Sequence, residues 1–419
     1  MADGVRNGAG DSARGGTYEV ARDGACDGRG ARGDMRDGTC DGTCDGSHES
    51  AHEDARDGGR WGERGGALME CAVFRGPENM AIERRPIPEC PDGGALVRVM
   101  ACGICGSDVR AYYNGLKGGA AEQIIGHEIA GEIVEAAPGA SRFRAGDRVA
   151  LAPDISCGEC YYCRRGLVNL CLRHRMLGTH LPGGFAQYVA LPRDVLEHGF
   201  AEPVPAGMSW THAAFAETVS AVLACQKRVG VSLGDSALII GDGPVGCLHA
   251  EVARARGASK VFIAGLDRLE TAAGFQPDLL LDSRDPEGCR EQVMRATGGI
   301  GVDFAICAVP DASAQERALA LCRKRGVLVI YGGAPASAEL SRLNSNAIHY
   351  GEITVTGSFS YPATGLADAL SAIRAGHVRP ERYISHVLPL REAARGIERL
   401  RSGKAVKIML DPWARQPLP

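Results

Sequence analysis

Four cysteines lie close together in one short, turn-rich stretch of the chain, CGECYYCRRGLVNLC, with the spacing C-x2-C-x2-C-x7-C. These residues are Cys157, Cys160, Cys163 and Cys171. Thiolates at this spacing can complete one tetrahedron around Zn2+ and leave no coordination position open for a substrate. The spacing therefore predicts a structural zinc site, and an iron–sulfur cluster is the alternative on ligand type alone.

A second set of metal-binding residue types is spread over three motifs. CGICGSD contains Cys105, GHE contains His127 and Glu128, and FAETVSA contains Glu217. A thiolate, an imidazole and a carboxylate suit a catalytic zinc, which needs a few protein ligands and one open position. Taken singly, each residue is equally well an ordinary core or surface side chain. Taken together with a nucleotide-binding motif, they predict a catalytic zinc site.

A glycine motif, GDGPVG, follows the strand-like run ALII and opens a helix-like run. In this G-x-G-x-x-G pattern the first glycine makes the tight turn, the second lets the backbone approach a pyrophosphate, and the third allows close helix–strand packing. The amides and the dipole at the start of the helix then favour phosphates. The predicted cofactor-binding residues are Gly241, Gly243, Pro244, Val245 and Gly246.

The end of the next strand is where a dinucleotide-binding unit carries an acid for the adenosine ribose. The chain reads VFIAGLDRLE there, and the strand-end position is Gly265. Asp267 could accept hydrogen bonds from ribose hydroxyls, whereas Arg268 could pair with a 2′-phosphate; both are otherwise ordinary solvated charges. Because a missing carboxylate removes the main repulsion against that phosphate, the sequence favours NADP over NAD.

The elements that position these residues fall into two kinds of pattern. Residues 67–217 contain short β-rich runs separated by Gly, Pro and Asp turns, which predict a compact β-rich domain. Residues 218–359 alternate apolar strands with amphipathic helices, which predicts a doubly wound parallel sheet. Residues 360–419 contain too few elements for a third domain and are expected to complete the first. Residues 1–66 are dominated by Gly, Asp and Arg and are expected to form a disordered, low-complexity tail.

The composition bounds the function. The chain has 419 residues, 47 basic and 51 acidic side chains and a formal net charge of -4, so it lacks the basic surface that nucleic-acid binding needs. It contains no apolar run long enough to span a membrane, and its first residues are polar. A cytoplasmic protein with a small-molecule substrate is expected. In a reducing compartment, 16 cysteines in a chain of this size point to metal rather than to disulfides.

The motifs CGICGSD, GHEIAGEIV, GDRVA, the four-cysteine lobe, GDGPVG and IHYGEITVTGSF occur in this order between about residues 69 and 413. In this respect the chain resembles the zinc-containing medium-chain dehydrogenases, nearest the sorbitol (L-iditol) and threonine dehydrogenase branch. The resemblance implies an α/β protein in which a GroES-like catalytic domain carries the metals and a Rossmann domain carries the cofactor. It also implies one catalytic and one structural zinc per chain, NAD or NADP, and a homodimer or homotetramer.

The resemblance assigns roles to individual residues. Cys105 and His127 look like zinc ligands, and the third protein ligand is similar to either Glu128 or Glu217 in different members. A carboxylate at Asp108 resembles the group that orients the zinc-bound histidine and fixes its tautomer. The remaining positions implied are Ser107 for proton relay and Tyr331, Gly332 and Phe359 along the nicotinamide. Where relatives often have a relay histidine, this chain has Arg110, which either reads an anionic or polyhydroxylated substrate or is simply solvated.

The expected activity is hydride transfer between NAD(P) and a secondary alcohol or ketone of a polyol, sugar alcohol or cyclitol. An amino-alcohol substrate, such as threonine, an amino sugar or an aminocyclitol, is the alternative, possible also in the ketone-reducing direction with NADPH. A zinc-less quinone reductase is contradicted by the four-cysteine lobe. A non-catalytic, dinucleotide-binding redox regulator would need broken catalytic ligands, and these are present.

Overall fold

The computed structural model describes most of the chain beyond the low-complexity segment. The residues outside the description are 1–65, 117–119, 141, 335 and 417–419. The tail expected over 1–66 therefore lies outside the described residues except for Gly66. The chain divides into the units Met1–Ala55 and Arg56–Pro419, and every described residue belongs to the second.

The β-rich half contains two sheets. The smaller has the strand order β2-β1-β4, and the larger has the order β16-β17-β3-β5-β6-β7, with β8 paired to β3 and β9 to β6. The strands are β1 (Leu68–Phe74), β2 (Met80–Pro86), β3 (Ala95–Gly103), β4 (Gln123–Ile124), β5 (Glu128–Ala136), β6 (Arg148–Ile155), β7 (Arg175–Met176), β8 (Tyr188–Leu191), β9 (Gly199–Pro203), β16 (Ile384–Pro389) and β17 (Lys407–Asp411). The helices of this half are α1 (Gly106–Asn114), α2 (Arg193–His198) and α10 (Ala393–Arg401). Alternating apolar residues of these strands form one buried core, which includes Val97, Ile129 and Leu151.

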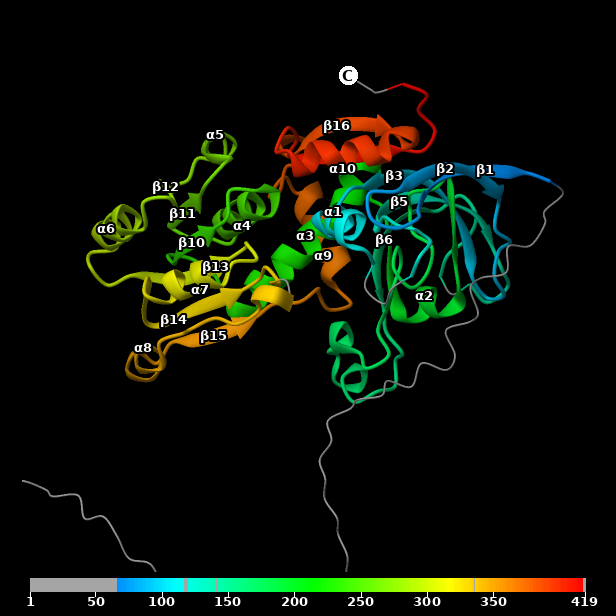
Figure 1. The fold of residues 1–419 in the computed structure, drawn as a ribbon. Helices are drawn as coiled ribbons and strands as arrows, with labels where there is room; N and C mark the ends of the chain where they lie inside the picture. The colour runs from blue at the N-terminus through cyan, green and yellow to red at the C-terminus, as the bar shows by residue number, and fades with distance from the viewer. Residues whose placement is uncertain (1–65, 117–119, 141, 335, 417–419) are drawn as a thin grey trace, which may run out of the picture. The chain divides into compact units, whose positions relative to one another are not determined.

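The C-terminal segment completes this β-rich half. Strand β17 pairs antiparallel with β3, with Met409 opposite Gly103, and β16 extends the sheet beyond β17. The return of the chain in Figure 1 brings the orange-red end of the molecule against the blue strands.

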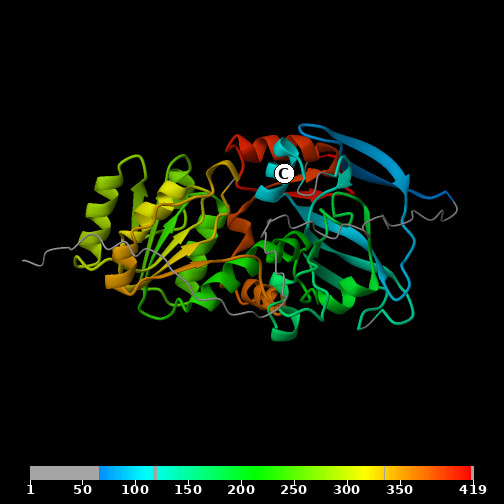
Figure 2. The ribbon, with the colours of Figure 1, turned by 60° about the horizontal axis from the view of Figure 1, so that its bottom comes forward.

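The other half is a six-stranded sheet with the order β12-β11-β10-β13-β14-β15, in which neighbouring strands run parallel. Its strands are β10 (Ser236–Ile240), β11 (Lys260–Gly265), β12 (Leu279–Asp282), β13 (Val302–Cys307), β14 (Cys322–Ile330) and β15 (Thr354–Gly357). Its helices are α4 (Pro244–Ala255), α5 (Leu269–Ala273), α6 (Pro286–Ala296), α7 (Ala312–Leu319) and α8 (Ser345–Gly351). Because α4 packs with one face of the sheet and α6 and α7 with the other, the predicted doubly wound fold is confirmed (Figures 1 and 2).

Two helices, α3 (Trp210–Val229) and α9 (Gly365–Arg374), pack against each other between the halves (Figure 1). The N-cap of α3 is Ser209, whose hydroxyl accepts from the His212 amide at 3.2 Å, and its C-cap Gly230 is left-handed. The buried face of α3 shares one core with residues of the larger β-rich sheet, such as Ala130, and of the parallel sheet, such as Ile239. The domain boundary expected between residues 217 and 218 therefore falls inside a continuous helix. Among the described residues, no helix combines the length and apolarity that crossing a bilayer requires.

Candidate metal and dinucleotide sites

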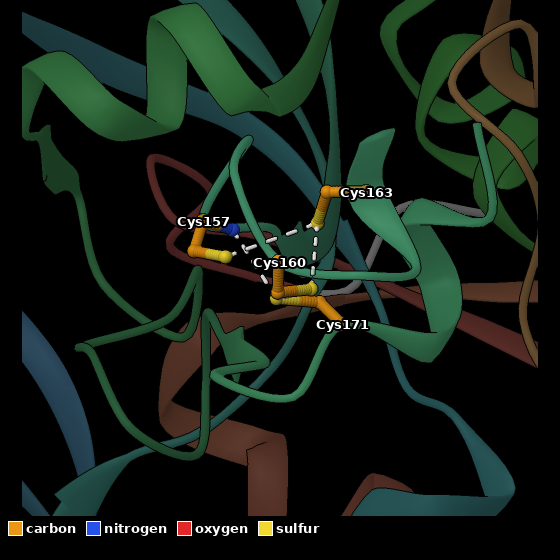
Figure 3. Close-up of side chains that lie close together, drawn as sticks. All are labelled: Cys157, Cys160, Cys163 and Cys171. Atoms are coloured by element: carbon orange, nitrogen blue, oxygen red, sulfur yellow. Dashed lines mark hydrogen bonds between the residues drawn. The ribbon is translucent and has the colours of Figure 1, made fainter. Parts of the chain in front are cut away.

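The four cysteines of the predicted zinc lobe converge on one point (Figure 3). Their sulfur atoms all lie within 4.8 Å of one another. The separations Cys160–Cys163, Cys157–Cys163 and Cys160–Cys171 are 3.5, 3.9 and 4.0 Å. Sulfur atoms around a tetrahedral zinc are about 3.8 Å apart, since a Zn–S bond is about 2.3 Å long. The donor set therefore fits a zinc ion.

The hydrogen-bond donors around the lobe act unequally on its cysteines: burial outweighs them at Cys171 and raises its pKa to about 12. The amides of Cys157 and Arg173 donate to the Cys171 sulfur at 3.2 and 3.3 Å. Desolvation opposes ionisation of Cys157, but hydrogen bonds from the Glu159 backbone and the Arg173 side chain outweigh it and lower its pKa to about 6. Gly158, with φ of +74°, makes the turn that lets the loop double back on itself. Two short 3-10 turns follow, η1 (Cys163–Arg165) and η2 (Val168–Leu170).

The second predicted metal group is assembled by two antiparallel strands. Gly103 at the end of β3 pairs with Glu128 at the start of β5. Cys105 follows the end of β3 and His127 precedes the start of β5, so the two residues lie at the same end of this strand pair. One donor atom each of Cys105, His127 and Glu128 lie within 4.8 Å of one another. A Cβ at position 103 would lie 1.9 Å from Glu128 Oε2, so only glycine leaves room for this carboxylate.

Glu128 is fully buried and is held from one side. Its Oε1 accepts hydrogen bonds from the Lys407 ammonium and, at 3.1 Å, from the Thr218 hydroxyl. Its Oε2 is buried and has no hydrogen-bond partner in the described part of the chain. Burial opposes the charge on Lys407, but the Glu128 carboxylate outweighs it and raises the Lys407 pKa. An unpartnered carboxylate oxygen beside a thiol and an imidazole fits a bound cation.

The imidazole of His127 has a carboxylate behind it. Asp108 Oδ1 lies 3.5 Å from His127 Nδ1, and Asp108 Oδ2 accepts from the Cys105 amide at 2.8 Å. Desolvation opposes protonation of His127, but Asp108 and the Cys105 sulfur outweigh it and raise the His127 pKa. The hydroxyl of Ser107 lies 3.5 Å from His127 Nε2. The residues expected around this histidine are thus brought together, whereas Arg110 is exposed on α1.

Glu217, the other candidate carboxylate, lies on α3 beside this group but outside its 4.8 Å limit. It is buried, and its Oε1 accepts a hydrogen bond of 3.0 Å from the Tyr361 hydroxyl. Burial raises the Glu217 pKa to about 7, and the nearby Glu128 adds to the rise while His127 opposes it. Of the two carboxylates that the sequence left open, the structure groups Glu128 with the thiol and the imidazole.

The glycine motif has the form that a pyrophosphate-binding loop requires. Gly241 follows β10 with φ of +129°, and Gly243 is the N-cap of α4, with Pro244 and Val245 in the first turn. A Cβ at Gly246 would lie 1.9 Å from the Gly241 carbonyl oxygen, so the helix can approach the strand only with glycine here. The half-buried amide end of this 12-residue helix fits a diphosphate.

The predicted ribose readers lie at the end of β11. Gly265 is its last residue, and the Asp242 side chain fills the space beside it. Asp267 pairs with Arg284 at 2.6 Å. Arg268 donates to a backbone carbonyl of the C-terminal segment at 3.0 Å. Each predicted reader therefore already has a protein contact.

A cavity of about 940 Å3 lies next to the lobe and the end of β14. Its walls include Leu167, Leu170, Tyr331, Gly332, Phe359 and Tyr361. One of its wall residues, Tyr361, donates a hydrogen bond to Glu217, which lies beside the candidate metal group. Burial raises the pKa of Tyr331, with Glu217 and Cys105 near enough to contribute. The positions predicted to line the nicotinamide thus surround one cavity beside the candidate metal group.

Three side chains of these sites were not singled out from the sequence: Asp242, Thr218 and Lys407. Lys407 is the one of them with a sequence signal, because it is a single charge in the otherwise apolar strand AVKIML. Asp242 stands at an unspecified position of the glycine motif, and Thr218 follows Glu217 on the same helix. No local pattern assigns either of these two a partner.

Two family models match the chain. The alcohol dehydrogenase GroES-like domain matches residues 91–199, and the zinc-binding dehydrogenase model matches residues 244–374. The first match contains both candidate metal groups, and the second begins within the glycine motif.

Similar proteins extend over nearly the whole described chain. The sorbitol dehydrogenase of Bombyx mori is 32% identical over 347 residues, which cover 81% of this chain and 97% of that protein. The erythritol/L-threitol dehydrogenase of Mycolicibacterium smegmatis is 30% identical, covering 82% and 98%. A solved structure from Sinorhizobium meliloti 1021, described as a zinc-binding dehydrogenase bound to NADP, is 28% identical with a TM-score of 0.75, covering 83% and 100%. The chain belongs to the zinc-containing medium-chain dehydrogenase family, in its sorbitol dehydrogenase-like branch.

Proposed function

We propose that the protein oxidises a secondary alcohol of a polyol, sugar alcohol or cyclitol to a ketone with a nicotinamide dinucleotide, and catalyses the reverse reduction. The observation that carries this proposal is the group of Cys105, His127 and Glu128 beside a cavity lined by Tyr331. The names of the sorbitol and erythritol/L-threitol dehydrogenases support the polyol substrate.

The residues divide into two metal sites. Cys105, His127 and Glu128 would hold a catalytic zinc, with Glu217 beside them on α3, and the four-cysteine lobe would hold a structural zinc. When bound, the catalytic zinc acts as a Lewis acid on the substrate oxygen and the nicotinamide accepts the hydride. An intact catalytic ligand set argues against a purely regulatory, non-catalytic protein.

The side chains around the ligands have separate tasks. Asp108 holds the imidazole of His127 in one orientation, so that its other nitrogen faces the metal group. The Ser107 hydroxyl, 3.5 Å from that nitrogen, is placed to relay the proton of the substrate alcohol, accepting it while passing its own proton on to water. Lys407 balances the charge of Glu128 and keeps its carboxylate fixed.

The glycine loop would hold the pyrophosphate of the dinucleotide, and Tyr331, Gly332 and Phe359 would border its nicotinamide. The sequence favoured NADP because Gly265 provides no carboxylate. The side chain of Asp242 lies beside Gly265 and is a second candidate for that carboxylate, which argues against a preference for NADP. The family resemblance supports a homodimer or homotetramer, which light scattering after size exclusion measures.

The test combines metal analysis with a substrate screen. Polyols, amino alcohols and the corresponding ketones are offered with NAD and NADP, and nicotinamide absorbance is followed. We expect two zinc ions per chain, and polyol turnover that falls by more than about 100-fold in Cys105→Ser while dinucleotide binding persists. Cys90→Ser, a thiol outside both metal groups, is the matched control. Unchanged turnover in Cys105→Ser would overturn the catalytic assignment.

A further inference from the structure

Strand β11 ends in a glycine, Gly265, and the side chain of Asp242 occupies the space beside it. A Cβ built on Gly265 would lie 2.3 Å from the Cβ of Asp242 and 2.5 Å from its Oδ2. These separations are far below van der Waals contact, so no side chain at position 265 can coexist with Asp242 as placed. The carboxylate of the glycine loop therefore occupies the space where a strand-end acid would begin.

The Asp242 carboxylate is held in this place by the backbone that follows the strand. Its Oδ2 accepts hydrogen bonds from the amides of Leu266 and Arg268, at 2.8 and 2.7 Å. Two amide donors on one oxygen fix the orientation of the carboxylate and leave Oδ1 for another donor. Within the described residues, Oδ1 accepts no side-chain or backbone hydrogen bond.

We propose that Asp242 replaces the missing acid of the second strand and makes the enzyme select NAD. This inference rests on the proposed function, since it assumes that the chain binds a nicotinamide dinucleotide. In a dinucleotide-binding fold the acid at this strand end accepts hydrogen bonds from the adenosine ribose hydroxyls. A carboxylate at the same place repels a 2′-phosphate, because two negative charges would be brought close together.

The neighbouring cations do not cancel this repulsion. Arg284 already pairs with Asp267 at 2.6 Å and with Asp282 at 3.3 Å. Arg268 lies 3.8 Å from the position of a Cβ on Gly243, over the glycine loop, where the pyrophosphate common to both dinucleotides would bind. It therefore contributes to binding NAD and NADP alike. Around the end of β11 there are thus three carboxylates and two guanidinium groups, those of Asp242, Asp267, Asp282, Arg268 and Arg284.

The test is calorimetric titration of the full-length protein with NAD+ and with NADP+. We expect NAD+ to bind tighter on the order of 100-fold, because like charges brought together cost several kcal/mol. In Asp242→Asn the amide oxygen still accepts from the two backbone amides, but the negative charge is gone. The NAD+/NADP+ affinity ratio should then fall at least about 10-fold, with NADP+ binding tighter than to the wild type.

Two further variants separate charge at this position from charge nearby. Asp267→Asn removes an equal charge from the same rim and should leave the ratio within about 2-fold of the wild type, because that carboxylate is exposed and paired. The double variant Asp242→Gly, Gly265→Asp moves the acid to the strand end and should restore the preference for NAD+. Gly265→Asp alone should weaken the binding of both dinucleotides, since the new side chain would overlap with that of Asp242.

The outcomes are distinguishable. Wild-type protein that binds NADP+ as tightly as NAD+, or an unchanged ratio in Asp242→Asn, would overturn the role of Asp242 and leave the proposed function intact. Failure to bind either dinucleotide would overturn the proposed function itself.

Discussion

Replacing Lys407 by methionine tests the electrostatics on which the candidate metal group depends. The Lys407 and Glu128 side chains are 6% and 0% exposed, so their ion pair is cut off from water. Lys407→Met keeps most of the volume but leaves the carboxylate without its cation. Breaking a buried pair by removing one partner costs roughly 3–5 kcal/mol. The chain can limit this loss by protonating Glu128, which at pH 7 costs about 3.7 kcal/mol for a carboxyl of ordinary pKa.

The loss should depend on pH with a defined sign. In Lys407→Met, burial without a cation should favour the uncharged carboxyl of Glu128, so we expect the folded variant to bind a proton that the unfolded chain has released at pH 7. Stability then increases as pH falls toward the unfolded pKa. At pH 5 protonation costs only about 1 kcal/mol, so most of the difference from the wild type should vanish.

The assay is urea unfolding of metal-depleted protein followed by circular dichroism at pH 7 and pH 5. Metal depletion matters because a bound ion would supply a second positive charge to the carboxylate. Lys407→Met, Glu128→Gln should recover most of the loss, since no charge is left unpaired. Lys227→Met is the matched control: its pair with Asp368 is 48% and 36% exposed, and its loss should stay below about 1 kcal/mol. A loss under about 1 kcal/mol in Lys407→Met at pH 7, or an equal loss at both pH values, would refute the reasoning.

Three further predictions concern the metals and the loop. Cys163→Ser should lower the zinc content by about one ion per chain and lower the melting temperature, because a tetrahedron with three thiolates holds zinc weakly; unchanged zinc by mass spectrometry would contradict the structural site. Gly246→Ala should weaken dinucleotide binding in calorimetry at least about 10-fold with zinc content unaltered, since its methyl would lie 1.9 Å from a carbonyl oxygen, and wild-type affinity would argue against the loop. Asp108→Asn should reduce the affinity of the catalytic site for zinc by about 10- to 100-fold in chelator competition, and an unchanged affinity would mean that Asp108 does not orient His127.

The features that could be predicted from the sequence are those formed by residues close together in the chain. The four cysteines lie within one loop, so their spacing alone limits them to one point, and the structure brings their sulfur atoms together. The glycine motif is equally local, because its turn and helix start involve six consecutive residues. The alternation of apolar strands and helices was enough to predict the parallel sheet, which the parallel pairing of its strands confirms.

The choice between Glu128 and Glu217 needed information that no local pattern carries. Glu128 enters the metal group because β3 and β5 pair with Gly103 opposite it, and a one-residue change of register would turn its side chain to the other face. Its cation, Lys407, lies 279 positions along the chain. A lone lysine in an apolar strand signals a buried partner, but only the sheet order β17-β3-β5 identifies which carboxylate that is.

Asp242 bears on the expectation of NADP, because that expectation considered a single position of the chain. The expectation for cofactor choice considered the residue that ends the second strand, because that residue usually carries the acid. The physical requirement is a carboxylate at that point in space, and the chain has two ways to meet it, since the glycine loop and the strand end are adjacent in a parallel sheet. A side chain at position 265 would overlap with that of Asp242, so the chain cannot carry both. The two positions therefore have to be considered together. Comparing the single variants with the double variant therefore measures a coupling between two positions, and a purely additive result would show that each residue contributes to cofactor choice independently of the other.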